Sequence, residues 1–132
     1  MTAFSFLTTH FFDYEWTSLL AQRLSQTVPS SATVQFLVID QDRTADSARR
    51  LAALVPHATV LQFPRSQRHF ERMGHDHAFV LNEAIKHVAG DLLVVFDSDA
   101  HPYTDDWLGT TVALLSDVDA VLAEDHLRPG FP

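Results

Sequence analysis

Two aspartates separated by a single serine, Asp97 and Asp99, follow directly on the apolar run Leu-Leu-Val-Val-Phe at residues 92–96. Five consecutive apolar residues are typical of a buried strand, and ligands of open α/β sheets gather at the carboxyl ends of the strands. Carboxylate oxygens are the ligands that Mg²⁺ and Mn²⁺ prefer. The pattern predicts a metal site at Asp97 and Asp99, with an ordinary polar turn as the alternative. His101, two residues further on, is predicted to contact the same ion or a phosphate.

Polar groups also end two other predicted strands. Thr8 and Thr9 close a run at residues 4–9, and Asp40 and Asp42 follow a run at residues 34–39. Because parallel strands end at one edge of a sheet, these groups could line one crevice with Asp97 and contact a base or ribose. The alternative for Asp40 and Asp42 is a solvated turn that leads into a capped helix.

A cluster of three arginines precedes the third predicted helix, and Arg72 is its last member. The guanidinium fork suits phosphate oxygens, so Arg72 is a candidate nucleotide-binding residue. A solvated basic loop is the competing interpretation.

Strand and helix patterns alternate along the chain. Strands are predicted at residues 4–9, 34–39, 59–63, 92–96 and 118–123, and helices at residues 16–24, 44–54, 75–88 and 104–115. Such alternation is typical of βαβ units with right-handed crossovers. We therefore expect an α/β fold, a Rossmann-like three-layer sandwich with a mostly parallel sheet.

The amino-acid composition of the chain argues against several classes of function. The 132 residues suffice for one domain, and the formal net charge of −8 disfavours binding to nucleic acid. The chain has no cysteine, which excludes disulfides, thiolate zinc sites and cysteine nucleophiles. No apolar stretch approaches the roughly 20 residues of a transmembrane helix, and no signal peptide is evident. These features lead us to expect a cytoplasmic protein.

Taken together and in this order, the motifs resemble the nucleotide-binding half of family 2 glycosyltransferases, which have the GT-A fold. The likeness begins with Phe-Ser-Phe-Leu-Thr-Thr at residues 4–9 and continues through Val-Ile-Asp-Gln-Asp at residues 38–42. It is best over residues 82–102, which contain Asp97 and Asp99, and extends to Asp-Asp-Trp-Leu at residues 105–108.

The resemblance implies that Asp40 contacts the base of a nucleotide-diphosphate sugar and that Asp97 lies near the ribose. It implies that Asp99 holds Mn²⁺ or Mg²⁺ on the diphosphate, for glycosyl transfer to an unknown acceptor. The family often has an arginine where this chain has Leu81, and Arg72 is the candidate replacement. Residues 1–132 are then one nucleotide-sugar-binding domain without the acceptor-binding half, and the catalytic base is unassigned.

Two other functions fit the same residues. One is a noncatalytic nucleotide-sugar-binding or interaction domain, which the short segment after the metal motif favours. The other is a metal-dependent phosphoesterase on a similar sheet, since one architecture hosts many activities. An exposed sheet edge could in addition favour a homo-oligomer.

Overall fold

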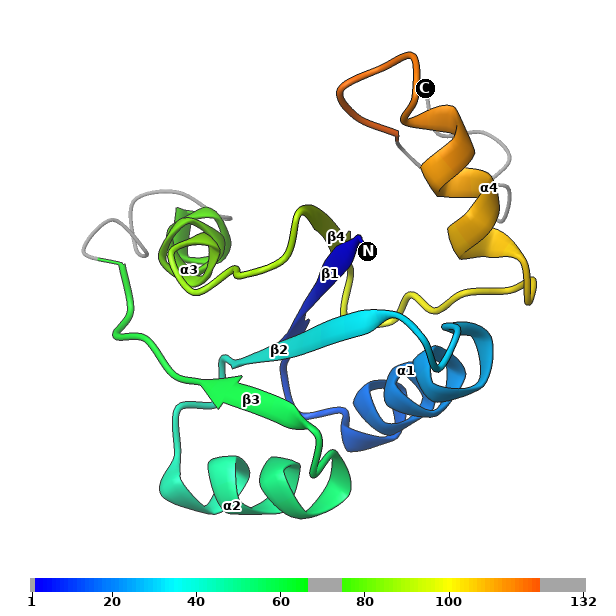
Figure 1. Ribbon diagram of the computed structural model, residues 1–132. Helices are drawn as coiled ribbons and strands as arrows, with labels where there is room; N and C mark the ends of the chain where they lie inside the picture. Colours follow the sequence, from blue (N-terminus) through cyan, green and yellow to red (C-terminus); the bar gives the residue numbers. More distant parts are fainter. Residues whose placement is uncertain (1, 67–74, 122–132) are drawn as a thin grey trace, which may run out of the picture.

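The computed structural model describes residues 2–66 and 75–121, which form a four-stranded parallel sheet with helices on both faces (Figure 1). The strands are β1 (Ala3–His10), β2 (Thr33–Asp40), β3 (Ala58–Leu61) and β4 (Leu92–Phe96). Their order across the sheet is β3-β2-β1-β4, and every neighbouring pair is parallel. The α/β class and the parallel sheet predicted from the sequence are confirmed.

The helices are α1 (Tyr14–Thr27), α2 (Ala45–Leu54), α3 (His75–Ile85) and α4 (Trp107–Leu114). Two begin at side-chain caps, because Asp13 accepts hydrogen bonds from two backbone N–H groups of α1 and Thr44 accepts one from Ser47 in α2. The predicted fifth strand is not formed at residues 118–121, and residues 122 and 123 lie outside the described residues. The apolar residues of this segment pair with none of the four strands described, and the Val118 side chain is half exposed.

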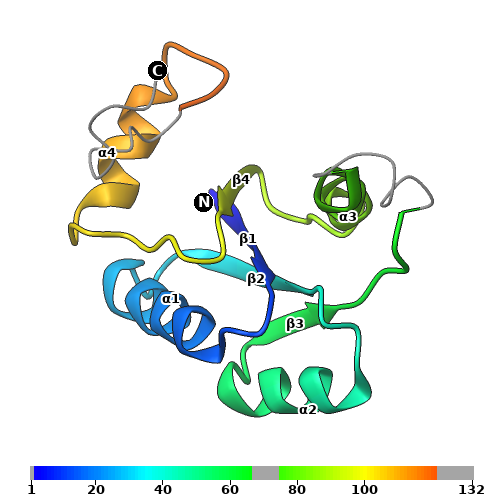
Figure 2. The ribbon, with the colours of Figure 1, turned by 180° about the vertical axis from the view of Figure 1, so that it is seen from behind.

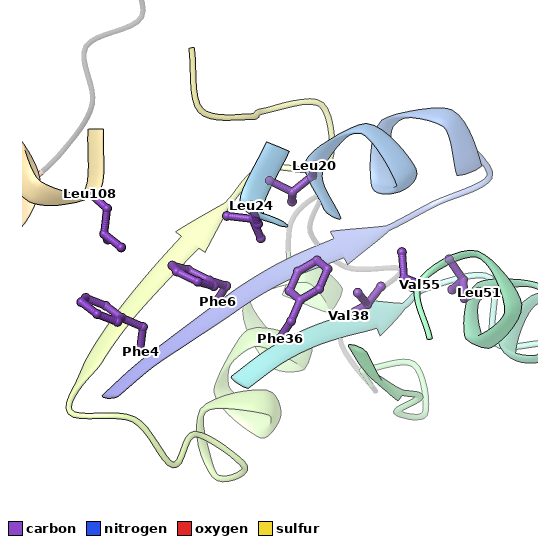
Figure 3. Close-up of a cluster of buried hydrophobic side chains, with 9 residues drawn as sticks. All are labelled: Phe4, Phe6, Leu20, Leu24, Phe36, Val38, Leu51, Val55 and Leu108. Atoms are coloured by element: carbon purple, nitrogen blue, oxygen red, sulfur yellow. The ribbon is translucent and has the colours of Figure 1, made fainter. Parts of the chain in front are cut away.

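The side chains of β1 alternate between two apolar layers. Phe4 and Phe6 face α1 and α2 together with Phe36, Leu20 and Leu51 (Figure 3). Leu7 points to the other face, where α3 covers the sheet, as the view from behind also shows (Figure 2). The sheet therefore lies between α1 and α2 on one side and α3 on the other.

Strand β1 is the most buried element of the sheet. Every residue from Phe4 to His10 is buried, because β1 has a strand on each side and helices on both faces. The edge strand β4 is only half covered, and Leu93 and Val95 on it are exposed. Polar residues at the end of β1 are consequently held in a dry, tightly constrained environment.

The turn before β4 locks this strand to the start of β1. The backbone N–H of Gly90 donates to Ser5 Oγ at 2.9 Å, and the Ala3 N–H donates to a carboxylate oxygen of Asp91 at 2.9 Å. A Cβ atom at residue 90 would lie 2.7 Å from the backbone carbon of Phe4, so only glycine fits there. This contact sets the register of β4 and thereby the position of the acidic residues that follow it.

None of the helices within residues 2–66 and 75–121 combines the length and the apolar character that a membrane crossing requires.

Replacing Gly90 with alanine should lower the free energy of unfolding by about 1–3 kcal/mol, because the new methyl group overlaps the β1 backbone. Urea denaturation followed by circular dichroism measures the change. Gly109 is the matched control, since it lies within α4 and a methyl group there would extend into open space, so Gly109→Ala should be neutral or stabilising by up to about 1 kcal/mol. Equal effects of the two substitutions would contradict the proposed role of Gly90.

Candidate nucleotide and metal site

The register of the sheet brings the predicted residues to one edge. His10 pairs with Asp40 across β1 and β2, and Thr8 pairs with Phe96 across β1 and β4. Asp97 therefore leaves β4 beside the end of β1, and Asp40 ends β2 on the other side of β1. The convergence of three strand ends expected from the sequence is present at the level of the backbone.

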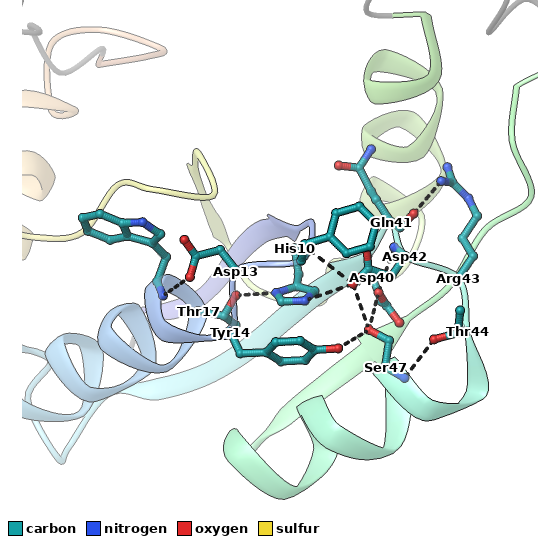
Figure 4. A network of polar contacts seen from close by, with 12 residues as sticks. His10, Asp13, Tyr14, Thr17, Asp40, Gln41, Asp42, Arg43, Thr44 and Ser47 are labelled. Atoms are coloured by element: carbon teal, nitrogen blue, oxygen red, sulfur yellow. Dashed lines mark hydrogen bonds and ion pairs between the residues drawn. The ribbon is translucent and has the colours of Figure 1, made fainter.

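At this edge the structure contains a compact His-Asp-Asp cluster, made of His10, Asp40 and Asp42 (Figure 4). One ligand atom from each lies within 4.8 Å of the others, and among the described residues this is the one such group. A cluster of this composition could hold a metal ion. It contains none of Asp97, Asp99 and His101, the three residues for which a metal was predicted.

Asp40 is fully buried and is held by three donors. Its Oδ1 accepts hydrogen bonds from the Asp42 N–H at 3.0 Å and from the Ser47 hydroxyl at 3.0 Å. Its Oδ2 accepts a 2.7 Å hydrogen bond from the side-chain amide of Gln62, an exposed residue just after β3. The carboxylate is thus fixed by α2 and by the segment that follows β3.

Asp42 and His10 are less well satisfied. Asp42 Oδ2 accepts from the Phe12 N–H at 3.2 Å, whereas its Oδ1 is buried without a hydrogen-bond partner in the described structure. His10 Nδ1 lies 2.8 Å from the Thr17 hydroxyl of α1, but its Nε2 also has no hydrogen bond, and its nearest acidic atom is Asp42 Oδ2 at 3.5 Å. Buried polar atoms are normally paired, so these two atoms need an explanation.

Burial sets the charge state of the histidine. Desolvation lowers the pKa of His10 below its usual value, and the negative charges of Asp42, Asp40 and Asp13 oppose this only in part. At neutral pH the imidazole is therefore neutral, the form in which histidine binds metals.

The two loops that carry the cluster have left-handed backbone residues. Phe12 follows β1 with φ of 61°, and Arg43 follows β2 with φ of 59°. This conformation costs a residue with a side chain roughly 1–2 kcal/mol, so the surroundings must hold it. Phe12 is held by its N–H bond to Asp42, and Arg43 by bonds from its guanidinium to the carbonyl of Gln41 and to Asp76.

The acidic turn after β4 is different in character. Asp97 and Asp99 are exposed, and their carboxylates make no hydrogen bond or ion pair with the other residues described. His101 is also exposed, and its ring stacks on Trp16 of α1 with centroids 6.0 Å apart. The two carboxylates are available to a ligand from solvent.

The remaining predicted residues vary in accessibility. Thr8 and Thr9 are buried at the end of β1, and the Thr8 hydroxyl donates only a long bond to the Thr9 carbonyl. Arg72 lies outside the described residues. His10 directly follows the predicted strand at residues 4–9, but no sequence motif assigns it a role. The missed signal is a histidine that ends a strand otherwise buried on both faces, where an ionisable side chain is rare.

Comparisons with known proteins support the fold. No family model matches the chain, and no curated protein matches it in sequence. The mannosyltransferase PcManGT from Pyrobaculum calidifontis, solved with GDP-Man and Mn²⁺, matches with a TM-score of 0.64 and 19% identity over 87% of this chain and 32% of that protein. TarS residues 1–349 from S. aureus match with a TM-score of 0.64 and 16% identity over 98% of this chain and 38% of that protein.

A second structure of S. aureus TarS 1–349, in complex with UDP-GlcNAc, matches with a TM-score of 0.55 and 17% identity over 87% of this chain and 31% of that one. At these identities the likeness establishes a shared fold. The resemblance to the fold of glycosyltransferases inferred from the sequence motifs is confirmed at that level. The chain spans about a third of the length of the solved proteins that it matches.

Ser47 provides a direct test of the buried network. Ser47→Ala removes the hydroxyl that bonds Asp40 and lies 3.3 Å from Asp42 Oδ2, so the free energy of unfolding should fall by about 1–3 kcal/mol although alanine is the better helix former. Chemical denaturation measures it, and Ser25→Ala on the exposed side of α1 is the control, with an expected change below about 0.5 kcal/mol. A Ser47→Ala protein as stable as the wild type would show that the network contributes no net stability.

Proposed function

We propose that this chain binds a nucleotide-diphosphate sugar together with a divalent cation, as the donor-binding part of a glycosyltransferase that acts on an unknown acceptor. The observation that carries the proposal is the acidic turn of Asp97 and Asp99, which lies exposed and unpaired among the described residues beside the end of β1, with the end of β2 on the other side of β1. Solved proteins that share this fold bind GDP-Man with Mn²⁺ and UDP-GlcNAc.

The residues at the acidic turn fit a hard cation. Asp97 and Asp99 offer only carboxylate oxygens, the donor type that Mn²⁺ and Mg²⁺ prefer. Both are exposed, so that waters and phosphate oxygens can complete the coordination. When bound, the cation would neutralise charge on the leaving diphosphate. His101 is the proposed third contact, and its ring stacks on Trp16.

For the nucleoside we propose Asp97 at the ribose and Asp40 at the base. Asp40 is buried, but one of its oxygens is covered only by the amide of the exposed residue Gln62. An amide N–H is chemically equivalent to the N–H groups on the edge of a uracil or guanine base. A base could therefore take the place of the Gln62 amide, which also donates to the Thr44 carbonyl at 2.8 Å. Thr8, Thr9, Asp42 and Arg72 complete the proposed nucleotide-binding set.

Isothermal titration of UDP and GDP, with and without Mn²⁺, tests the proposal. One of the two nucleotides should bind in a Mn²⁺-dependent manner, and Asp97→Asn or Asp99→Asn should weaken that binding at least about tenfold, equivalent to about 1.4 kcal/mol. Asp119→Asn removes the same charge from an exposed position after α4 and should leave the affinity unchanged. Absence of binding by the wild-type chain, or equal losses in all three variants, would refute the function.

A second pair of variants tests the base contact. Gln62→Ala uncovers the Asp40 carboxylate and should strengthen nucleotide binding, whereas Asp40→Asn should weaken it. Neither substitution should change the affinity for Mn²⁺ with inorganic pyrophosphate, which lacks a base. Circular dichroism confirms that the variants are folded. If Gln62→Ala weakens binding of the nucleotide, Gln62 itself holds the ligand and the assignment of Asp40 is wrong.

A further inference from the structure

We propose that the His-Asp-Asp cluster of His10, Asp40 and Asp42 is a structural zinc site, separate from the cation that accompanies the nucleotide. The cluster joins β1 to β2 beneath the surface of the sheet edge and is built from one imidazole and two carboxylates. It shares Asp40 and Asp42 with the proposed nucleotide-binding set, but its evidence and its test involve no nucleotide.

The first argument is the pair of unsatisfied atoms. His10 Nε2 and Asp42 Oδ1 are both buried, and neither has a hydrogen-bond partner in the described structure. The His10 side chain is 0% exposed and that of Asp42 is 5% exposed, so bulk water does not reach them freely. A metal ion bound by both residues would satisfy each of these atoms at once.

The second argument is distance. His10 Nε2 and Asp42 Oδ2 are 3.5 Å apart, which is too long for a good hydrogen bond. Zinc–nitrogen and zinc–oxygen bonds of about 2.0–2.1 Å in a tetrahedron place two ligand atoms roughly 3.3–3.4 Å apart. The observed separation is close to this value. A zinc ion bound by His10 Nε2 and by both carboxylate oxygens of Asp42 would also satisfy Asp42 Oδ1, whereas a proton between Nε2 and Oδ2 would leave Oδ1 unpaired.

The third argument is charge. Asp40 and Asp42 bring two carboxylates into a buried space, and no Lys or Arg among the described residues forms an ion pair with either. The neighbouring Arg43 is directed to Asp76 instead. Hydrogen-bond donors stabilise these carboxylates only in part, since buried charges are normally paired with an opposite charge or bound to a metal, and a divalent ion would neutralise both.

The surroundings of the cluster are those of a metal site. Metal-binding histidines usually have the other ring nitrogen hydrogen-bonded, and ligating carboxylates are held by further donors. Here Thr17 is bonded to His10 Nδ1, while Ser47 and Gln62 hold Asp40. A carboxylate has about four lone-pair sites, so Asp40 can bind a metal and keep these bonds. Mixed imidazole and carboxylate ligands favour Zn²⁺ over Mg²⁺ or Ca²⁺.

The test uses the full chain stripped with a chelator and titrated with ZnCl₂ in the absence of nucleotide. One equivalent should bind, and the midpoint of thermal unfolding should rise by at least about 5 °C. His10→Gln or Asp42→Asn should lower the affinity at least about tenfold. His57→Gln, at an exposed histidine, and Asp99→Asn, at the proposed nucleotide cation, should both bind zinc as the wild type does.

Two further measurements keep the test decisive if His10→Gln does not fold. Thr17→Val preserves the size of the side chain that orients His10 and should weaken zinc binding about 10- to 100-fold. X-ray absorption of the zinc-loaded wild type should show one imidazole nitrogen with carboxylate oxygens at about 2.0–2.2 Å. An unfolding temperature that zinc does not move, several imidazole ligands, or equal losses in His57→Gln and His10→Gln would overturn the proposal.

Discussion

The parallel pairing of β1 with β2 on one side and β4 on the other determines where every polar group of the site lies. Side chains alternate along a strand, so a slip of one residue would move His10 from the α1 face to the α3 face. Phe4 and Phe6 on one side and Leu7 on the other oppose such a slip, because each would leave its apolar layer. Gly90 adds a second lock at the opposite end of β1 through its close contact with the backbone. The positions of the polar groups at the carboxyl edge of the sheet therefore depend on apolar side chains that pack several residues earlier in β1.

Energetically unfavourable features of the fold are concentrated at the end of β1. A strand covered on both faces ends in two threonines and a histidine, opposite the buried carboxylate of Asp40. The flanking loops adopt left-handed conformations at Phe12 and Arg43, and two buried atoms have no hydrogen bond in the described structure. Strain and unsatisfied polar groups concentrated in one place are typical of sites that bind a ligand. The apolar layers elsewhere on the same strands stabilise the fold and so offset the free-energy cost of this arrangement.

The sequence predicted the elements of the fold and their parallel arrangement, but not the specific contacts between residues far apart in the chain. The strand β4 followed by Asp97, and a capped helix after Asp42, depend on patterns within a few neighbouring residues. The segment at residues 118–121 shows the limit, since apolar residues form a strand only where another strand offers its hydrogen-bonding edge. The His-Asp-Asp cluster could not be predicted because it requires the register of β1 against β2, the direction of the His10 ring and the position of Ser47. None of these is encoded by spacing within one segment.

The two acidic regions of this sheet edge differ in the property that decides which cation each can retain. Asp97 and Asp99 are exposed and offer oxygen alone, so an ion there keeps much of its water, exchanges readily and can travel with a diphosphate. His10 and Asp40 are buried, Asp42 is half-buried, and the three include a nitrogen donor. This cluster therefore favours a borderline-soft metal that sheds most of its water and is held by the ends of two strands. The exposed acidic turn therefore suits a cation that arrives with each nucleotide. The His-Asp-Asp cluster suits a cation that stays bound to the folded chain. Because β1 lies between the two, a metal that fixes His10 would also fix the neighbouring Thr9 and, through the pairing of β1 with β4, the point from which the acidic turn leaves the sheet.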